Sequence, residues 1–145
     1  MAEELLRRTY DLHGRDFDKA GEVATTIKRM LNDIGIDAGI VHRVVVIAFE
    51  AEMNVVMYAD KGTMTLFLTD ADIGLEVADE GPGIEDLEMA LTEGFSTATD
   101  KMREMGFGFG MGLPNIRKNA DDFSIESDVG VGTTIRTKIR LNSSA

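Results

Sequence analysis

The sequence predicts an α+β domain, a two-layer α/β sandwich in which helices lie on one face of a mixed, mostly antiparallel sheet. Two early segments show helical periodicity, and two later pairs of segments alternate like strands joined by short turns. No repeat, low-complexity tract or proline-rich linker divides the chain. Helices followed by antiparallel hairpins favour a single layer of helices on the sheet, and one domain is expected over residues 1–145.

Two helices are expected before the first hairpin. Apolar residues recur at helical spacing over residues 17–34, with Asp16 or Asp18 as the expected N-cap. After the interruption "IGID", a second helix is expected over about residues 37–57. Because this segment is apolar over much of its circumference, it should be largely buried.

The strands are predicted from alternation. "TMTLFLTD" and "DIGLEVAD" are separated by an acidic turn and indicate a first β-hairpin. "DFSIES" and "TTIRTKIRL" alternate across the turn "DVGVG" and indicate a second. Residues 5–12 alternate weakly and suggest one further strand.

Composition excludes several function classes. A net charge of −11 argues against a nucleic-acid footprint, so protein or small-molecule partners are expected instead. The absence of cysteine and the presence of only two histidines, His13 and His42, exclude disulfides and thiolate or histidine-rich zinc sites. No apolar run is long enough to span a bilayer, and the first residues lack the features of a signal peptide, so a cytoplasmic location is expected.

The parity of two strands turns polar groups toward the core. In "DIGLEVAD" the apolar residues Ile73, Leu75 and Val77 occupy odd positions, so Asp79 is expected on the same inner face. The same parity in the last strand turns Thr133 inward. A buried carboxylate needs a protein donor or a bound ligand. The alternative is that Asp79 only caps the turn "EGPG".

An acid and an amide project from the buried helix near a glycine-rich loop. Glu50 and Asn54 in "EAEMN" are four residues apart and share one helix face. In "DEGPG", Gly81 and Gly83 permit a tight turn and a close approach. Together these residues offer oxygen and amide ligands for a hard cation such as Mg²⁺. Such a pair is often only a hydrogen-bonded surface pair, and the neighbouring Glu52 is interpreted as solvated.

Alternating glycines occupy residues 106–112, in "MGFGFGMGLPNI", and lead into an amphipathic segment that begins near Leu113. A helix N-terminus offers free N–H groups, and glycines let phosphate oxygens reach them. The pattern matches neither a P-loop nor a dinucleotide fingerprint. The loop is therefore expected to be mobile without nucleotide and to close on phosphates; the alternative is a permanently ordered loop held in the core by Phe107 and Phe109.

These motifs resemble the GHKL ATPase superfamily, which has the Bergerat ATP-binding fold. "EAEMN" resembles its N box, "DEGPG" its first glycine box, "GFGFGMGL" its second and "GVGTT" its terminal Gly-Thr element. All four occur in the family's order within residues 50–134, and the flanking elements extend the resemblance over nearly the whole chain.

The resemblance implies ATP and Mg²⁺ as ligands and assigns roles to residues. Asp79 would receive the amino group of adenine, and Thr133 would assist at the base. Asn54 would hold Mg²⁺ on the triphosphate, Glu50 would act as general base, and an ATP lid would occupy about residues 93–112. The expected nucleotide-binding residues are Asn54, Asp79, Gly81, Gly83, Gly106, Gly108, Gly110, Met111, Gly112, Leu113 and Thr133.

Within the superfamily, the chain most resembles the bacterial anti-sigma-factor serine/threonine kinases, especially the switch-kinase branch. It shows no upstream helix pair with a phosphoacceptor histidine and no transducer domain, and it carries "DEGPGI" and "EGFSTA" before the lid. The resemblance implies phosphorylation of Ser or Thr on a STAS-domain antagonist protein. The alternative is a nucleotide-gated binding module that sequesters a sigma factor or activates a phosphatase without catalysis. Tyr58 stands where relatives often have histidine, and a homodimer is left open.

Overall fold

The protein contains a five-stranded sheet with the strand order β1-β2-β3-β5-β4, and the computed structural model describes residues 3–91 and 112–141. Every pairing in this sheet is antiparallel. The predicted α+β sandwich and both hairpins are therefore confirmed. The described sheet is antiparallel throughout rather than mixed, because β5 lies between β3 and β4 and runs opposite to both. The strands are β1 (Glu4–His13), β2 (Lys61–Thr69), β3 (Asp72–Glu80), β4 (Asp122–Asp128) and β5 (Gly132–Arg140).

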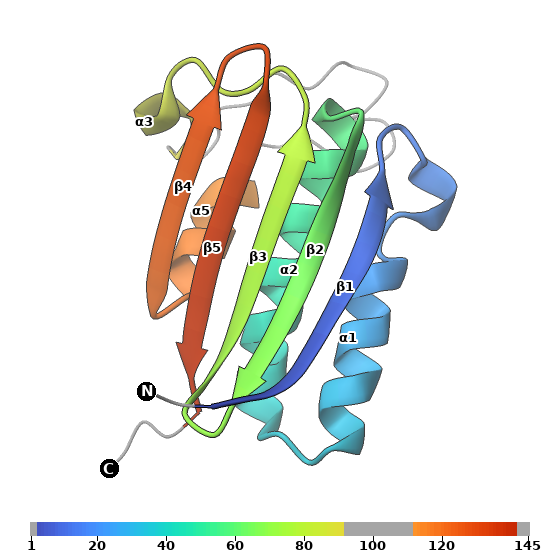
Figure 1. The fold of residues 1–145 in the computed structure, drawn as a ribbon, viewed down its shortest axis with the longest axis vertical. Helices are drawn as coiled ribbons and strands as arrows, with labels where there is room; N and C mark the ends of the chain where they lie inside the picture. Colours follow the sequence, from blue (N-terminus) through green and yellow to red (C-terminus); the bar gives the residue numbers. More distant parts are fainter. Residues whose placement is uncertain (1–2, 92–111, 142–145) are drawn as a thin grey trace.

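The long helices lie on one face of the sheet, as Figure 1 shows. The sheet's other face is polar: the Thr9 and Thr65 hydroxyls lie 3.1 Å apart, and Arg136 pairs with Glu76 at 3.1 Å. One solvated face is usual for an antiparallel sheet. The helical elements are η1 (Phe17–Lys19), α1 (Glu22–Asp33), α2 (Ala38–Tyr58), α3 (Leu87–Ala90) and α5 (Gly112–Asn119).

Helix α2 forms the centre of the helical layer, and its predicted burial is confirmed. It packs on the sheet and is flanked by α1 and α5. Asp37 caps it by accepting N–H hydrogen bonds from Gly39 at 3.0 Å and Ile40 at 3.3 Å. Although α2 is long and apolar, no helix in the described ranges has the length and hydropathy to cross a membrane.

Helix α1 begins later than its periodicity suggests. Residues 17–19 form a separate 3-10 turn, and the α-helix starts at Glu22 after Gly21, which has a φ of 95°. Neither Asp16 nor Asp18 caps α1. The expected N-caps were therefore wrong, because the left-handed backbone at Gly21 interrupts the helix and the cap comes from another helix.

That cap is the side chain of Glu52 on α2. Its carboxylate accepts N–H hydrogen bonds from Gly21 at 3.0 Å, Val23 at 3.3 Å and Ala24 at 3.0 Å. Glu52 is 3% exposed, so the interpretation of this residue as solvated was wrong. These three N–H groups at the start of α1, together with the positive end of the helix dipole, stabilise the buried negative charge of Glu52.

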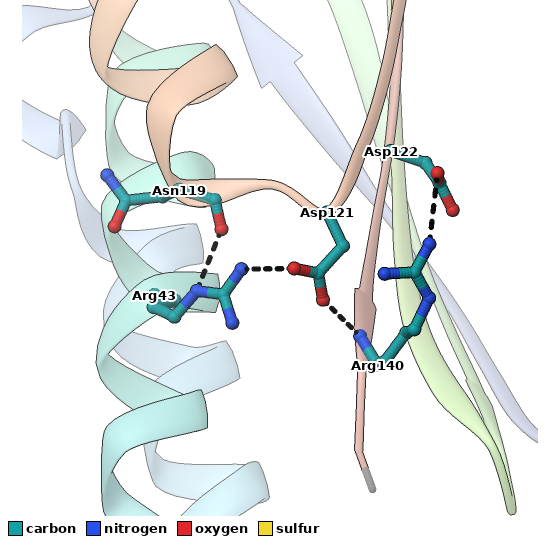
Figure 2. A network of polar contacts seen from close by, with 5 residues as sticks. All are labelled: Arg43, Asn119, Asp121, Asp122 and Arg140. Carbon is teal, nitrogen blue, oxygen red and sulfur yellow. Dashed lines mark hydrogen bonds and ion pairs between the residues drawn. The ribbon is translucent and has the colours of Figure 1, made fainter. Parts of the chain in front are cut away.

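A polar network fastens the other end of the helical layer (Figure 2). The Arg43 guanidinium donates to the carbonyl of Asn119, the last residue of α5, at 2.9 Å and to the Asp121 carboxylate at 3.0 Å. The second oxygen of Asp121 accepts the backbone N–H of Arg140 at 2.7 Å. Arg140 also pairs with Asp122 at 3.4 Å. This network joins α2, the end of α5 and both strands of the second hairpin.

Replacing Glu52 by alanine should strongly destabilise the fold. The Glu52→Ala variant leaves three part-buried or buried N–H groups without their acceptor, and we expect it to lower the free energy of unfolding by about 3 kcal/mol. Urea unfolding measures this loss. The matched control is Glu22→Ala, an exposed acid in the first turn of the same helix, which should lose less than about 1 kcal/mol. Equal losses would contradict the capping role.

Replacing Asp121 by asparagine should destabilise the fold at neutral pH and not in acid. The Arg140 N–H bond, with the Arg43 guanidinium, lowers the pKa of the Asp121 carboxyl. A lowered folded-state pKa means stabilisation that is present above the unfolded pKa and is lost as the pH falls through the folded pKa. Asp121→Asn should therefore lose about 1 kcal/mol at pH ~7, and the difference from wild type should shrink toward zero below pH ~3.

Asp122→Asn is the control for this experiment, because within the described residues its exposed carboxylate pairs with the exposed Arg140 side chain at 3.4 Å. Urea unfolding of both variants at several pH values provides the comparison. A deficit of Asp121→Asn that stays constant down to pH ~3 would show that the charge of Asp121 is not what stabilises the network.

Candidate functional site

The polar residues predicted for the site come from four elements that meet at one end of the molecule. The end of β3, the beginning of β5 and the C-terminal end of α2 lie together at the upper end of Figure 1. The first residue of α5, Gly112, lies against α2 near this end. Motifs far apart in the sequence therefore surround one region.

Asp79 lies on the inner side of the end of β3, as its parity predicts. Its Oδ1 accepts the backbone N–H of Thr133 at 3.1 Å, and its side chain is half-buried. Burial raises the pKa of the Asp79 carboxyl, and the hydrogen bond from Thr133 partly opposes this shift. The carboxylate thus bonds across to β5 rather than to the turn that follows it.

Thr133 is 9% exposed and makes a second polar contact. Its Oγ1 lies 2.8 Å from the Oγ of Ser127, which faces it in the register of the β4–β5 hairpin. Ser127 also accepts the backbone N–H of Ile84 at 2.8 Å. Sequence reasoning missed Ser127. The predicted hairpin could have indicated Ser127, because pairing across "DVGVG" sets "ES" opposite "TT".

The glycines of "DEGPG" let the chain fold closely on itself. Gly83 has a φ of 75°, and a side chain there would collide with the backbone of Asp128. A side chain at Gly132 would likewise collide with the carbonyl of Asp79. The Gly81 N–H donates to the Val131 carbonyl at 3.2 Å. These contacts hold the tip of the second hairpin against the end of β3.

Glu50 and Asn54 face the beginning of α5. A methyl group at Gly112 would lie 3.3 Å from Asn54 Oδ1 and 3.8 Å from Glu50 Oε2. Asn115, one turn into α5, donates from Nδ2 to Glu50 Oε2 at 3.2 Å. Asn115 was not predicted, although a polar residue between the buried Leu113 and Ile116 could have indicated it. The predicted pair is thus joined by a third polar side chain.

The side chains of Asn54 and Glu50 are suited to hold a magnesium ion that is carried by a nucleotide. Among residues 3–91 and 112–141, no cluster of three or more acidic or histidine side chains is placed to hold a metal alone. Magnesium on phosphates needs no such cluster, because one or two protein oxygens complete its shell with phosphate and water oxygens. The Asn54 amide oxygen and the Glu50 carboxylate beside the N–H groups of α5 are donors of this kind.

The remaining predicted residues are only partly described. Leu113 is 9% exposed and packs in the core, so only its backbone can serve a ligand. Gly106, Gly108, Gly110, Met111 and the lid before Gly112 lie outside the described residues. The alternative involving Phe107 and Phe109 lies outside them as well.

Comparison with known proteins places this site in a family. Residues 34–143 match the family described as histidine kinase-, DNA gyrase B- and HSP90-like ATPase. The serine/threonine-protein kinase RsbT of Bacillus subtilis is 35% identical over 92 residues, which cover 60% of this chain and 62% of that protein.

Two proteins named anti-sigma F factor are also similar to this chain. That of Caldanaerobacter subterraneus subsp. tengcongensis is 35% identical over 60% of this chain and 61% of its own length. That of Bacillus subtilis is 36% identical over 56% of this chain and 52% of its own length. The chain therefore spans between half and about three fifths of the relatives it matches. From the family match over most of its length and the arrangement of its motifs, this chain belongs to the histidine kinase-, DNA gyrase B- and HSP90-like ATPases.

Proposed function

We propose that this protein is an ATP-dependent serine/threonine protein kinase of the anti-sigma regulatory type. One observation supports this most. The half-buried Asp79, held by Thr133, stands at the end of β3, which lies at the same end of the fold as the C-terminal end of α2. Glu50 and Asn54 on α2 face the start of α5. A base-binding carboxylate and a phosphate-facing helix end are the two halves of a nucleotide site.

The adenine base binds at Asp79. Its carboxylate is an acceptor in a half-buried position, and the exocyclic amino group of adenine is a donor. The Thr133 N–H occupies Oδ1 at 3.1 Å and so fixes the plane of the carboxylate for the base. Partial burial strengthens a hydrogen bond between the two, because water competes less for either group.

The triphosphate lies toward the N-terminus of α5. The N-terminal turn of this helix and its dipole would favour phosphate oxygens, and Gly112 carries no side chain there that would block their approach. Bound magnesium would neutralise developing charge on the phosphates, with the Asn54 oxygen as its protein ligand. The glycines of the lid, residues 93–112, would close over the phosphates.

Glu50 is the general base in this proposal. It would accept the proton of a Ser or Thr hydroxyl as the hydroxyl oxygen attacks the γ-phosphate. The Asn115 amide donates to Glu50 Oε2 at 3.2 Å, which restricts the carboxylate's rotation and leaves its other oxygen for the hydroxyl. A STAS-domain antagonist is the proposed substrate, and one domain is proposed over residues 1–145.

A binding module without catalysis is the second candidate. The names of two relatives, anti-sigma F factor, favour it, because they denote proteins that act against a sigma factor. In this case nucleotide would only gate the binding of a sigma factor or the activation of a phosphatase. The sequence-based expectations of a cytoplasmic location and a homodimer stay predictions.

Labelled ATP distinguishes the kinase from the binding module. Wild-type protein incubated with γ-labelled ATP, Mg²⁺ and STAS-domain proteins should transfer label to Ser or Thr. Glu50→Ala should keep ATP affinity and lose transfer at least about a hundredfold, because general-base catalysis supplies that much. Asn54→Ala should instead lose the Mg²⁺-dependent part of the affinity. The exposed Glu22→Ala should behave as wild type.

Transfer by Glu50→Ala at the normal rate would remove the general base from the mechanism. ATP binding by wild type without transfer to any STAS-domain protein would favour the binding module.

Asp79→Asn should lose ATP and gain stability. Asparagine can still accept the Thr133 N–H, but its amide presents a donor or a weaker acceptor to adenine, so calorimetry should show no ATP binding. Because burial raises the folded-state pKa of Asp79, the stability linked to its proton is lost as the pH rises through that pKa. Thermal unfolding at pH ~7 should therefore show the variant at least as stable as wild type, with no advantage below pH ~3.

Wild-type ATP affinity in the Asp79→Asn variant would contradict adenine binding by Asp79 and leave this residue a structural role. A variant that unfolds at a lower temperature at pH ~7 would instead show that the charged form of Asp79 stabilises the fold.

A further inference from the structure

Arg43 is connected to the proposed general base by a path of hydrogen bonds that leaves α2 and returns to it. The Arg43 Nε donates to the backbone carbonyl of Asn119 at 2.9 Å, and the side-chain amide of Asn119 donates to the carbonyl of Asn115 at 2.8 Å. The side-chain amide of Asn115 donates to Glu50 Oε2 at 3.2 Å. Both ends of this path lie on α2, and its two middle residues lie on α5.

The spacing of these residues places them on facing sides of two helices. Arg43 and Glu50 are seven residues apart, about two helical turns, and so share one side of α2. Asn115 and Asn119 are four residues apart and so share one side of α5. The earlier residue on α5 contacts the later residue on α2, so the two helices run in opposite directions and are joined by a polar contact near each end of this side.

Arg43 is itself held in place from the sheet. Its guanidinium also donates to the Asp121 carboxylate at 3.0 Å, whose second oxygen accepts the backbone N–H of Arg140 on β5 at 2.7 Å (Figure 2). Asn119 ends α5, and the last carbonyls of a helix favour a donor with a positive charge. Arg43 therefore fixes the end of α5 relative to both α2 and the sheet.

The apolar contacts of α5 set its position along α2 less sharply. Leu113 and Ile116 pack into the core, but apolar burial is non-directional and tolerates small shifts. A hydrogen bond weakens steeply when its distance or angle changes. A shift of α5 after the loss of Arg43 would therefore alter the contact between Asn115 and Glu50, and with it the orientation of the carboxylate.

We propose that Arg43 is a positioning residue for phosphoryl transfer, which acts through Asn119 and Asn115 on the orientation of the Glu50 carboxylate. The inference rests on the proposed kinase function and gives a role to a residue outside the motifs of the site. Because Arg43 acts on the general base and not on the adenine-binding region, its loss should lower kcat rather than the affinity for ATP.

Transfer of label from γ-labelled ATP to STAS-domain proteins, at saturating ATP and Mg²⁺, tests this role. Arg43→Met removes the donors of the side chain, and kcat should fall about tenfold, because small misplacements of a catalytic group are costly. The ATP affinity measured by calorimetry should change less than about threefold. Asn119→Ala removes the amide in the middle of the path, keeps the carbonyl, and should lower kcat in the same way.

Arg140→Met is the matched control, because it removes the other arginine of the network, whose guanidinium pairs with Asp122. This variant should keep the kcat of wild type. Thermal unfolding of every variant, with each assay run below the unfolding temperature, separates a loss of fold from a loss of positioning.

Combined variants separate one connected path from independent effects. Arg43→Met together with Asn119→Ala should lose no more than about twofold beyond the larger single loss, because both changes break the same path. In a Glu50→Ala background, Arg43→Met should not lower the residual transfer further, because the carboxylate that Arg43 positions is absent.

Losses that multiply in the combined variant, or a further loss in the Glu50→Ala background, would overturn the proposal, because they indicate a structural effect that does not pass through Glu50. Wild-type kcat in Arg43→Met, or a fall in ATP affinity as large as the fall in kcat, would overturn it as well. Wild-type protein that transfers no label to any STAS-domain protein would instead refute the proposed function itself.

Discussion

The buried carboxylate of Glu52 is the interaction on which the helical layer depends. It accepts three N–H groups at the start of α1 and is 3% exposed, so α2 cannot rotate about its axis without uncovering a charge. Two residues along a helix are about 200° apart, so Glu50 and Asn54, two positions on either side of Glu52, face away from α1. The contact that binds α1 therefore also turns the two proposed catalytic and magnesium residues toward α5.

Helix α5 is held against α2 by two polar contacts, so the contacts that stabilise the helical layer also position the site. Asn115 bonds to Glu50 near its beginning, and Arg43 holds the carbonyl of Asn119 at its end. Leu113 and Ile116 of the same helix pack into the core. A helix held in this way presents its N-terminal N–H groups from a fixed position, which is what an anion site requires.

The proposed base-binding end is arranged differently, because here the fold retains a group that opposes its own stability. Burial raises the pKa of Asp79, which means that the charged form is less favourable in the fold than in water. The Thr133 N–H offsets part of this. Gly132 allows the backbone approach between β5 and Asp79, and Gly83 allows the approach of the loop after β3 to the end of β4. A hydrogen-bond donor on a ligand can stabilise the charge of a carboxylate that the protein itself stabilises only in part.

Much of this protein was determined by its local sequence. The period of two in the strands oriented Asp79 and Thr133 correctly, the apolar circumference of α2 indicated its burial, and the helical spacing of four placed Glu50 and Asn54 on one face, because these patterns depend only on neighbours along the chain. Only the tertiary structure decided that Glu52 is buried, that α1 begins at Glu22, and that Asn115 and Ser127 join the site. Each of these outcomes depends on a hydrogen bond to a partner on another element, and neither propensity nor periodicity carries information about which distant N–H or hydroxyl a polar side chain will meet.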